Sequence, residues 1–303
     1  MAGSSATSAT LYTGLTEAHY AAIIHETVEE AIMATNVCKK LCRQEDISAQ
    51  PSRALQVNFW DANTAAAALT EVQDLTNTAL TLSSVTLTAA EVGAMTTLSD
   101  WLLETSVGAL REVASYGTQL GLSISKKIDT DITALFSALN GGTAVGTGSG
   151  ETDIVGTFEE ALAELEDNDA ANLGTSIACI LHSKNTSQMR RQLLGASGAP
   201  SYATGIIFDD WSSKSQFYTD RNGYFGTLLG VDIFQTNNVA GVNYAKRGAM
   251  IVPGVTLAYV SKRATRPFTE RDESFRFTEV GATIAYAVGE LRDTAGVCLS
   301  LDA

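Results

Sequence analysis

Two short stretches near the amino terminus carry residue types that bind metals. His25, Glu26 and Glu29 match the start of the helix that zinc proteases use, but a glutamate stands where the second histidine ligand is required. Cys38 and Cys42 lie one helical turn apart and could share a metal ion, yet no nearby histidine completes a set of four ligands. We interpret the first stretch as the polar face of a helix, and we predict no metal site.

Two further patterns resemble catalytic or nucleotide-binding sites. Cys179 and His182 are close enough in sequence to be a nucleophile and its base. On a strand, however, residues three apart point to opposite faces, and a cysteine in an apolar run is typical of a buried core. The glycine-rich stretch at 146–150 lacks the ending of a phosphate-binding loop and is interpreted as a linker. We therefore predict no catalytic residue and no cofactor.

Residues 263–273 are a different case, because arginines there alternate with acidic and hydroxyl side chains between two long β-forming runs. One interpretation is a solvated turn. The other is a projection at the tip of a long hairpin that exchanges ion pairs with neighbouring copies of the chain. With two aromatic residues of an earlier hairpin added, the second interpretation predicts inter-subunit contacts at Arg263, Arg266, Glu270, Arg271, Asp272, Glu273, Phe59 and Trp60.

The composition excludes several classes of protein. The 303 residues, 45% hydrophobic and 18% charged, suit one large or two modest folded domains. No apolar run approaches the roughly 20 residues of a membrane helix, and no secretion signal is visible, so we expect synthesis in the cytoplasm and reduced cysteines. A net charge of −14 argues against sequence-specific binding of nucleic acid, whereas an acidic wall that only encloses nucleic acid stays open.

A long helix is the strongest local signal in the sequence. Apolar or small residues recur at steps of three or four across 110–139, which corresponds to roughly 45 Å of helix. Gly117 and Gly121 indicate that another segment packs closely against its middle turns. Charges do not flank the apolar stripe as they do in a coiled coil. We therefore predict a spine helix inside an α+β domain.

Shorter elements surround this helix. After a small, polar arm, an amphipathic helix is predicted at 16–41, and a short helical piece at 98–106. Alternation at 55–60 and 81–88 predicts an extended hairpin, which is marginal alone in water and is expected to rest on a partner surface. Residues 140–150 are expected to form a flexible loop. The other predicted helices are 157–167 and 185–194, and the other predicted strands are 177–182, 206–208, 224–225, 231–235, 249–252, 255–261, 275–289 and 297–301.

The order of these elements resembles the major capsid protein family of tailed phages, which has the Hong Kong 97 fold. The more specific stretches are LSDWLLETS at 98–106, LGVDI at 229–233 followed by AMIV at 249–252, and TERDESF at 269–275 running into 283–292. The resemblance covers nearly the whole chain in element order. It implies an α+β fold with an N-terminal arm, a protruding E-loop hairpin, a peripheral (P) domain with the long spine helix, and an axial (A) domain.

The resemblance also implies a division of the chain and a role. It assigns 1–53 to the N-terminal arm with its helix, 54–90 to the E-loop, 91–150 and 253–303 to the P domain, and 151–252 to the A domain. The implied role is a non-enzymatic capsid subunit that forms pentamers and hexamers around double-stranded DNA, resides in the virion and is made in the host cytoplasm. Because few residues precede the first helix, a separate scaffolding protein is expected, together with a portal, while the presence of a decoration protein stays open.

Some family members weld the shell with a covalent bond between a lysine of the E-loop and an asparagine of a neighbour's P domain. Here no lysine occurs between Arg53 and Lys126, and no asparagine follows Asn243. Non-covalent burial, strand addition and salt bridges are therefore expected to hold the shell together, or a separate cement protein.

Two rival interpretations stay open at this point. The nearer is the shell protein of an encapsulin-type nanocompartment, which shares the fold and stores cargo enzymes. The other, from a different class, is a soluble acidic hydrolase whose activity would depend on Cys179 or His182. A capsid protein and a nanocompartment shell protein would both form particles, whereas the hydrolase would not. The packaged contents, DNA or cargo enzymes, would then separate the capsid from the nanocompartment.

Overall fold

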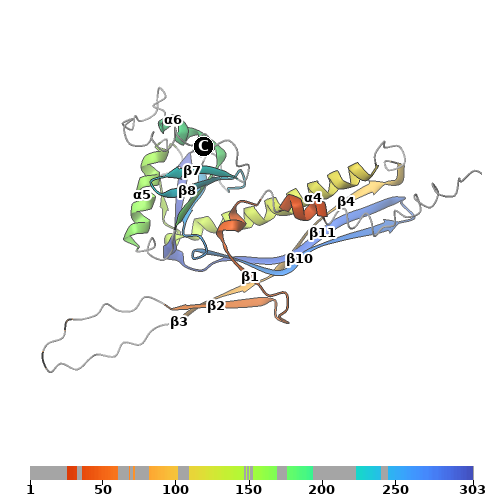
Figure 1. Ribbon diagram of the computed structural model, residues 1–303, viewed down its shortest axis with the longest axis horizontal. Helices are drawn as coiled ribbons and strands as arrows, with labels where there is room; N and C mark the ends of the chain where they lie inside the picture. The colour runs from red at the N-terminus through yellow and green to blue at the C-terminus, as the bar shows by residue number, and fades with distance from the viewer. Residues whose placement is uncertain are drawn as a thin grey trace, which may run out of the picture.

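The computed structural model describes residues 26–32, 36–60, 68, 71, 82–101, 109–146, 148, 150, 153–168, 176–193, 223–239 and 245–302. Its strands form three sheets, of four, six and two strands. The long helix α4 lies along the four-stranded sheet, and the six-stranded sheet stands near one end of that helix beside α5 and α6 (Figure 1). The hairpin of β2 and β3 extends away from both (Figure 1). This mixed architecture confirms the predicted α+β class.

The four-stranded sheet is built on one long hairpin. Its order is β1-β10-β11-β4, with β1 at Arg43–Asp46, β4 at Ala90–Ser99, β10 at Leu257–Asp272 and β11 at Phe277–Glu290. The antiparallel pairing of β10 with β11 runs from Leu257 opposite Glu290 to Asp272 opposite Phe277. The prediction of a charged turn at 263–273 was therefore wrong in extent. Residues 263–272 belong to the paired strand, and only 273–276 make the turn.

The spine helix prediction is confirmed. Helix α4 covers Ala109–Ala134 and continues as a 3-10 turn, η2, at Leu135–Ala138. Its buried side carries large apolar residues at helical spacing, namely Leu120, Ile124, Ile128, Ile132 and Phe136, with Leu139 after the turn. These pack in one core with Tyr259 of β10 and with Val280, Ala282, Ile284 and Tyr286 of β11. One face of the four-stranded sheet is thereby covered by the helix.

Gly121 shows why the middle of α4 needs a small residue. A Cβ atom at this position would lie 2.7 Å from the backbone oxygen of Val28 and 2.7 Å from the Cβ of Ala31. Residues 26–32, which are helical, therefore lie directly against the spine. The predicted close packing at Gly121 is confirmed, and the partner is the amino-terminal helix of the same chain.

Two predicted helices have different limits in the structure. The helix predicted at 16–41 does not reach Leu41, because Cys38–Leu41 form a separate 3-10 turn, η1; positions 16–25 and 33–35 lie outside the described residues. The helical piece predicted at 98–106 was wrong at its start. Strand β4 continues to Ser99, which pairs with Phe277 of β11, so the backbone there is committed to the sheet. Positions 102–108 lie outside the described residues.

The six-stranded sheet has the order β5-β12-β9-β6-β8-β7. Its strands are β5 Ala144–Val145, β6 Ile177–Leu181, β7 Tyr224–Leu228, β8 Val231–Gln235, β9 Ala245–Ile251 and β12 Gly296–Asp302. Helices α5 at Ile154–Asp167 and α6 at Ser183–Leu193 accompany it. The side chain of Asp153 caps α5 by accepting a hydrogen bond from the backbone N–H of Gly156, at 3.0 Å.

Pairing in this sheet differs from two expectations. Strand β12, expected with the long strands in one unit at 253–303, pairs antiparallel with β9, from Gly296 opposite Ile251 to Asp302 opposite Ala245. The loop expected at 140–150 contains a 3-10 turn, η3, at Asn140–Gly142, and the short strand β5, which pairs with β12. Both differences arise from pairing between distant segments, which local sequence does not encode. The strand predicted at 206–208 lies outside the described residues.

The projecting hairpin consists of β2 at Ala54–Trp60 and β3 at Leu82–Thr88. Its base rests on the chain itself, because Val57 and Leu87 share a buried cluster with Ala258, Val260, Ala287 and Leu291 of the long hairpin and its end. Leu87 lies directly over Gly289, where any Cβ would overlap its Cδ2 atom. The hairpin is therefore anchored at its base by the face of the four-stranded sheet that α4 leaves uncovered.

Candidate functional site

Within the described part of the chain, the residues that the sequence suggested for catalysis or metal binding do not come together as such a site. Cys38, Cys42 and Cys179 are buried free thiols. Burial raises the pKa of the Cys179 thiol well above its usual value and that of Cys42 to about 12, so both are protonated and poorly nucleophilic at neutral pH. Nδ1 of His182 accepts a hydrogen bond from the backbone N–H of Lys184 at 3.2 Å. His25 lies outside the described residues, among which no three metal-binding side chains come together.

The tip of the long hairpin is held by an arginine between two carboxylates. Arg271 donates through both terminal nitrogens to Asp100, at 2.9 and 3.4 Å, and through Nε to Glu273, at 3.1 Å. These ion pairs raise the pKa of Arg271, with the charge of Asp100 as the largest cause. Because Asp100 follows β4, the arginine fixes the hairpin tip to the neighbouring strand end. Arg271 is therefore engaged within the subunit.

The turn itself is closed by Asp272. Its Oδ1 atom accepts hydrogen bonds from the Ser274 hydroxyl at 2.7 Å and from the backbone N–H groups of Ser274 and Phe275 at 2.9 and 3.1 Å. These bonds, that of the Ser274 side chain first, lower the pKa of Asp272. Beside the turn, an open hollow of about 370 Å³ is lined by 270–274 and Glu279. With four carboxylates and one already paired arginine, this hollow suits a cationic side chain.

Two of the other charged residues predicted for contacts, Arg263 and Arg266, lie along the strand and not at its tip. Arg263 of β10 forms an ion pair with Glu91 of β4 and donates to the Thr283 hydroxyl at 3.2 Å. Arg266 and Glu270, further along β10, are exposed. The structure therefore brings Glu270, Arg271, Asp272 and Glu273 together around the tip hollow, and leaves Arg263 and Arg266 apart from them.

Exposed apolar side chains accompany both projections, and the sequence reasoning missed most of them. Phe275 at the hairpin tip is 73% exposed and Trp101 after β4 is 74% exposed. On the projecting hairpin, Trp60 lies opposite Leu82, and both are more than half exposed. The sequence signal that could have revealed them is a large apolar residue at a position where the alternation of a strand predicts a solvent-facing side chain. Large apolar residues left in water at projecting edges are typical of surfaces that a partner covers.

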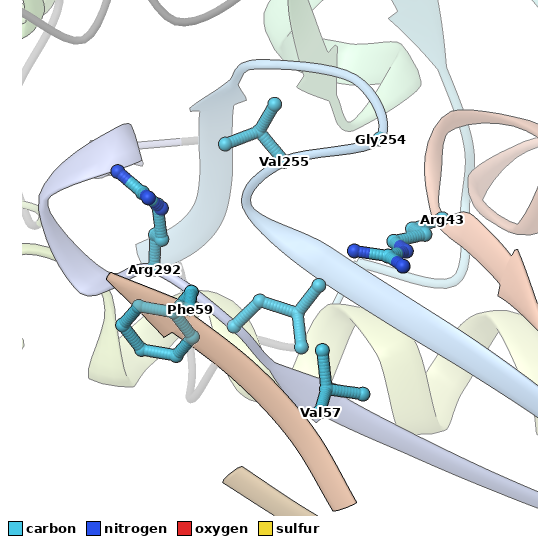
Figure 2. A pocket seen from close by; sticks show the side chains of 7 residues that line it. Arg43, Val57, Phe59, Gly254, Val255 and Arg292 are labelled. Atoms are coloured by element: carbon cyan, nitrogen blue, oxygen red, sulfur yellow. The ribbon is translucent and has the colours of Figure 1, made fainter. Parts of the chain in front are cut away.

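Phe59 is engaged with a residue that the sequence did not single out. The Arg292 guanidinium lies over the Phe59 ring at 5.4 Å and donates to the backbone oxygen of Trp60 at 3.3 Å. Beside this contact is a pocket of about 240 Å³, lined by Arg43, Val57, Phe59, Gly254, Val255, Leu291 and Arg292. Figure 2 shows Arg43 and Arg292 on opposite sides of it, with apolar side chains between them.

A buried polar stripe on α4 is a second feature that sequence reasoning missed. Ser125, Asp129 and Thr133, at successive four-residue steps, are almost fully buried. Asp129 accepts from the backbone N–H groups of Val37 and Cys38 at 3.4 and 3.3 Å, and from the Asn238 amide at 3.5 Å. Burial raises its pKa against the opposing effect of these hydrogen bonds. The stripe therefore joins the spine to the start of η1 and to the segment after β8.

No described helix combines the length and the apolar character that crossing a membrane requires. In the comparisons, the family model for phage capsid proteins matches residues 83–299. No curated protein sequence matches the chain.

Several solved structures are similar to this chain, among them a phage capsid and a virus-like particle. A chain of Mycobacterium phage Che8 superposes with a TM-score of 0.64 at 18% identity, covering 88% of this chain and 91% of that one. The capsid of Ralstonia phage GP4 gives 0.63 at 9% identity, with 87% of each chain covered. A virus-like particle from Pyrococcus furiosus gives 0.57 at 10% identity, with 91% and 97% covered. At such low sequence identity, these superpositions establish that the chains share a fold and nothing more.

Proposed function

The chain belongs to the phage capsid protein family, and we propose that its copies associate into pentamers and hexamers that close an icosahedral shell around double-stranded DNA. It is a structural major capsid protein with the Hong Kong 97 fold. The family match over 83–299 carries the proposal and favours it over a nanocompartment shell or an acidic hydrolase. Residence in the virion follows from the same membership.

The projecting parts of the subunit support association by burial of edges. Trp60 and Leu82 expose apolar surface on the E-loop hairpin β2–β3, and Phe275 and Trp101 expose it near the tip of the P-domain hairpin β10–β11. Burying apolar surface contributes roughly 25 cal/mol per Å². An isolated subunit would leave these surfaces in water, whereas a shell would cover them.

We propose two roles for the charged residues of the P-domain hairpin. Arg271 and Asp272 shape the tip, since both are bound within the subunit. Glu270 and the exposed Glu273, which Arg271 contacts through Nε only, line the tip hollow, where a neighbour's lysine or arginine would add a second partner. Arg263 and Arg266, further back on β10, are proposed to contact a neighbour that crosses the sheet. Such exposed pairs set geometry and salt dependence more than affinity.

The remaining assignments follow as proposals. We propose the division into arm, E-loop, P domain and A domain that the resemblance implies, with one change: the pairing of β12 with β9 supports assigning 296–302 to the A domain. The net charge of −14 supports enclosure of DNA without tight binding, because phosphates and the wall repel each other. A scaffolding protein, a portal and a decoration protein are the proposed partners in assembly, which begins in the host cytoplasm.

Electron microscopy of the purified protein, made alone and together with its scaffolding protein, tests the proposal. Closed shells of uniform size are expected, and particles from infected cells are expected to protect double-stranded DNA from nuclease. A protein that stays monomeric in both preparations would contradict self-assembly. Shells from cells that hold enzyme cargo and no DNA would instead support the nanocompartment.

A further inference from the structure

The pocket between Arg43 and Arg292 lies at the base of the E-loop, where four parts of the chain meet. Arg43 comes from β1, Val57 and Phe59 from β2, and Leu291 and Arg292 from the segment that follows β11. Gly254 and Val255, before β10, close the remaining side. Figure 2 shows Val57, Phe59 and Val255 between the two arginines. The pocket therefore has an apolar lining and a cation at either end.

The two arginines differ in how far their charge is already balanced. Arg43 pairs with Glu45, 2.7 Å from its terminal nitrogen, and this pair is partly exposed. Arg292 is held by the Phe59 ring and by the backbone oxygen of Trp60 and has no carboxylate partner among the described residues. A guanidinium that is already held over an aromatic ring loses little freedom when it binds a carboxylate through two parallel hydrogen bonds. The pocket is thus preorganised for an anion.

The side chains that line the pocket limit which kind of ligand it can bind. Four apolar side chains, Val57, Phe59, Val255 and Leu291, would gain nothing from a hydrated phosphate alone, but they would bury an apolar group beside the anion. A peptide segment with an acidic and a neighbouring apolar side chain offers both. Acidic residues outnumber basic ones by 34 to 20 in this chain, so its own surface is rich in such partners.

We propose that this pocket receives an acidic side chain, with an apolar neighbour, from a second copy of the chain. The inference rests on the proposed self-assembly and adds a specific receptor to it. A phosphate of enclosed DNA is the competing ligand.

Carbodiimide cross-linking of assembled particles tests the proposal directly. In Arg292→Lys particles, the new amine can form an amide bond only with a carboxylate within reach. The expected product joins position 292 to an acidic residue of another copy, found by mass spectrometry and distinguished from internal links by mixing isotopically light and heavy subunits. Arg247→Lys is the matched control, since Arg247 is exposed on β9 and lies outside the pocket.

The possible outcomes test the proposed contact at the pocket independently of whether the chain assembles into shells. At least tenfold more inter-copy links at position 292 than at 247 would support the proposal. Links only to Glu290 or Asp293 of the same copy, or equal yields at 292 and 247, would overturn it even when the shells are normal. If Arg292→Lys gives no shells, Arg43→Lys places the amine at the other end of the pocket and carries the same criterion. Loss of inter-copy links only in DNA-filled particles would identify DNA phosphate as the ligand.

Discussion

The contact between Leu87 and Gly289 offers a quantitative check on how the E-loop is anchored. Leu87 is only 5% exposed, and its Cδ2 atom occupies the space that a side chain at Gly289 would need. Leu87→Ala should therefore destabilise the subunit by about 2–5 kcal/mol, through lost burial and the cavity left behind. Gly289→Ala should cost about 1–3 kcal/mol on its own, because the added methyl group displaces the leucine.

The double variant Leu87→Ala with Gly289→Ala should be more stable than the two separate costs predict. Once the leucine branches are gone, the methyl group at 289 meets no clash and fills part of the cavity. The double variant should thus unfold close to Leu87→Ala alone, with a favourable coupling of about 1–3 kcal/mol between the two sites.

Urea unfolding of the isolated subunits, followed by tryptophan fluorescence, measures these differences. Trp60 lies on the hairpin that Leu87 anchors and reports its detachment. Thr86→Ala, an exposed position on the same strand, is the control and should change stability by no more than about 0.5 kcal/mol. Strictly additive costs for Leu87→Ala and Gly289→Ala would refute the direct packing of the E-loop on β11. Particle yield should fall in the same order as subunit stability if the anchored hairpin is needed for assembly.

Three further changes test other parts of the molecule. Arg271→Glu should leave the subunit folded but give few particles, or particles that open at low salt, because the tip would gain a carboxylate beside Asp100 and Glu273; particles indistinguishable from wild type by microscopy would exclude a role for the tip. Burial raises the pKa of Asp129, so the folded state holds that proton more tightly than the unfolded chain, and protonation favours folding as pH falls from neutral towards about 4. Wild type should accordingly gain stability relative to Asp129→Asn over that range in urea titrations, and a pH-independent difference would contradict a raised pKa. Trp60→Ala should alter subunit stability by no more than about 0.5 kcal/mol, since the side chain is 58% exposed, while lowering particle yield in sedimentation assays; unchanged yield would remove Trp60 from the assembly surface.

The residue types that suggested a contact surface were visible in the sequence, but the pairing of their side chains was not. The charged stretch at 263–273 and the aromatic pair Phe59 and Trp60 were visible as unusual side chains on predicted β elements. The pairing of Arg271 with Asp100 could not be seen in this way, because that partner lies 171 positions away. Arg292 and its pocket were missed for the same reason, since their lining is assembled from four separate segments.

Local periodicity by itself determined several elements of this protein. The apolar stripe of α4 and the alternation of β2, β3 and β11 can be read from residues close together in the sequence. A helix repeats every 3.6 residues and a strand every 2, so apolar residues at those spacings lie on one face of the element. The glycine at position 121 likewise indicated, from sequence alone, that another segment packs closely against the helix there.

Tertiary structure alone decided which elements meet. The pairing of β12 with β9, the continuation of β4 to Ser99 and the burial of Asp129 under η1 all depend on partners far away in sequence. The hydrogen bonds of a sheet are made by backbone groups that nearly every residue carries. The local composition of a strand therefore does not specify which other strand will pair with its edge. That choice is made by packing of the whole subunit, and it determines which edges remain for the shell.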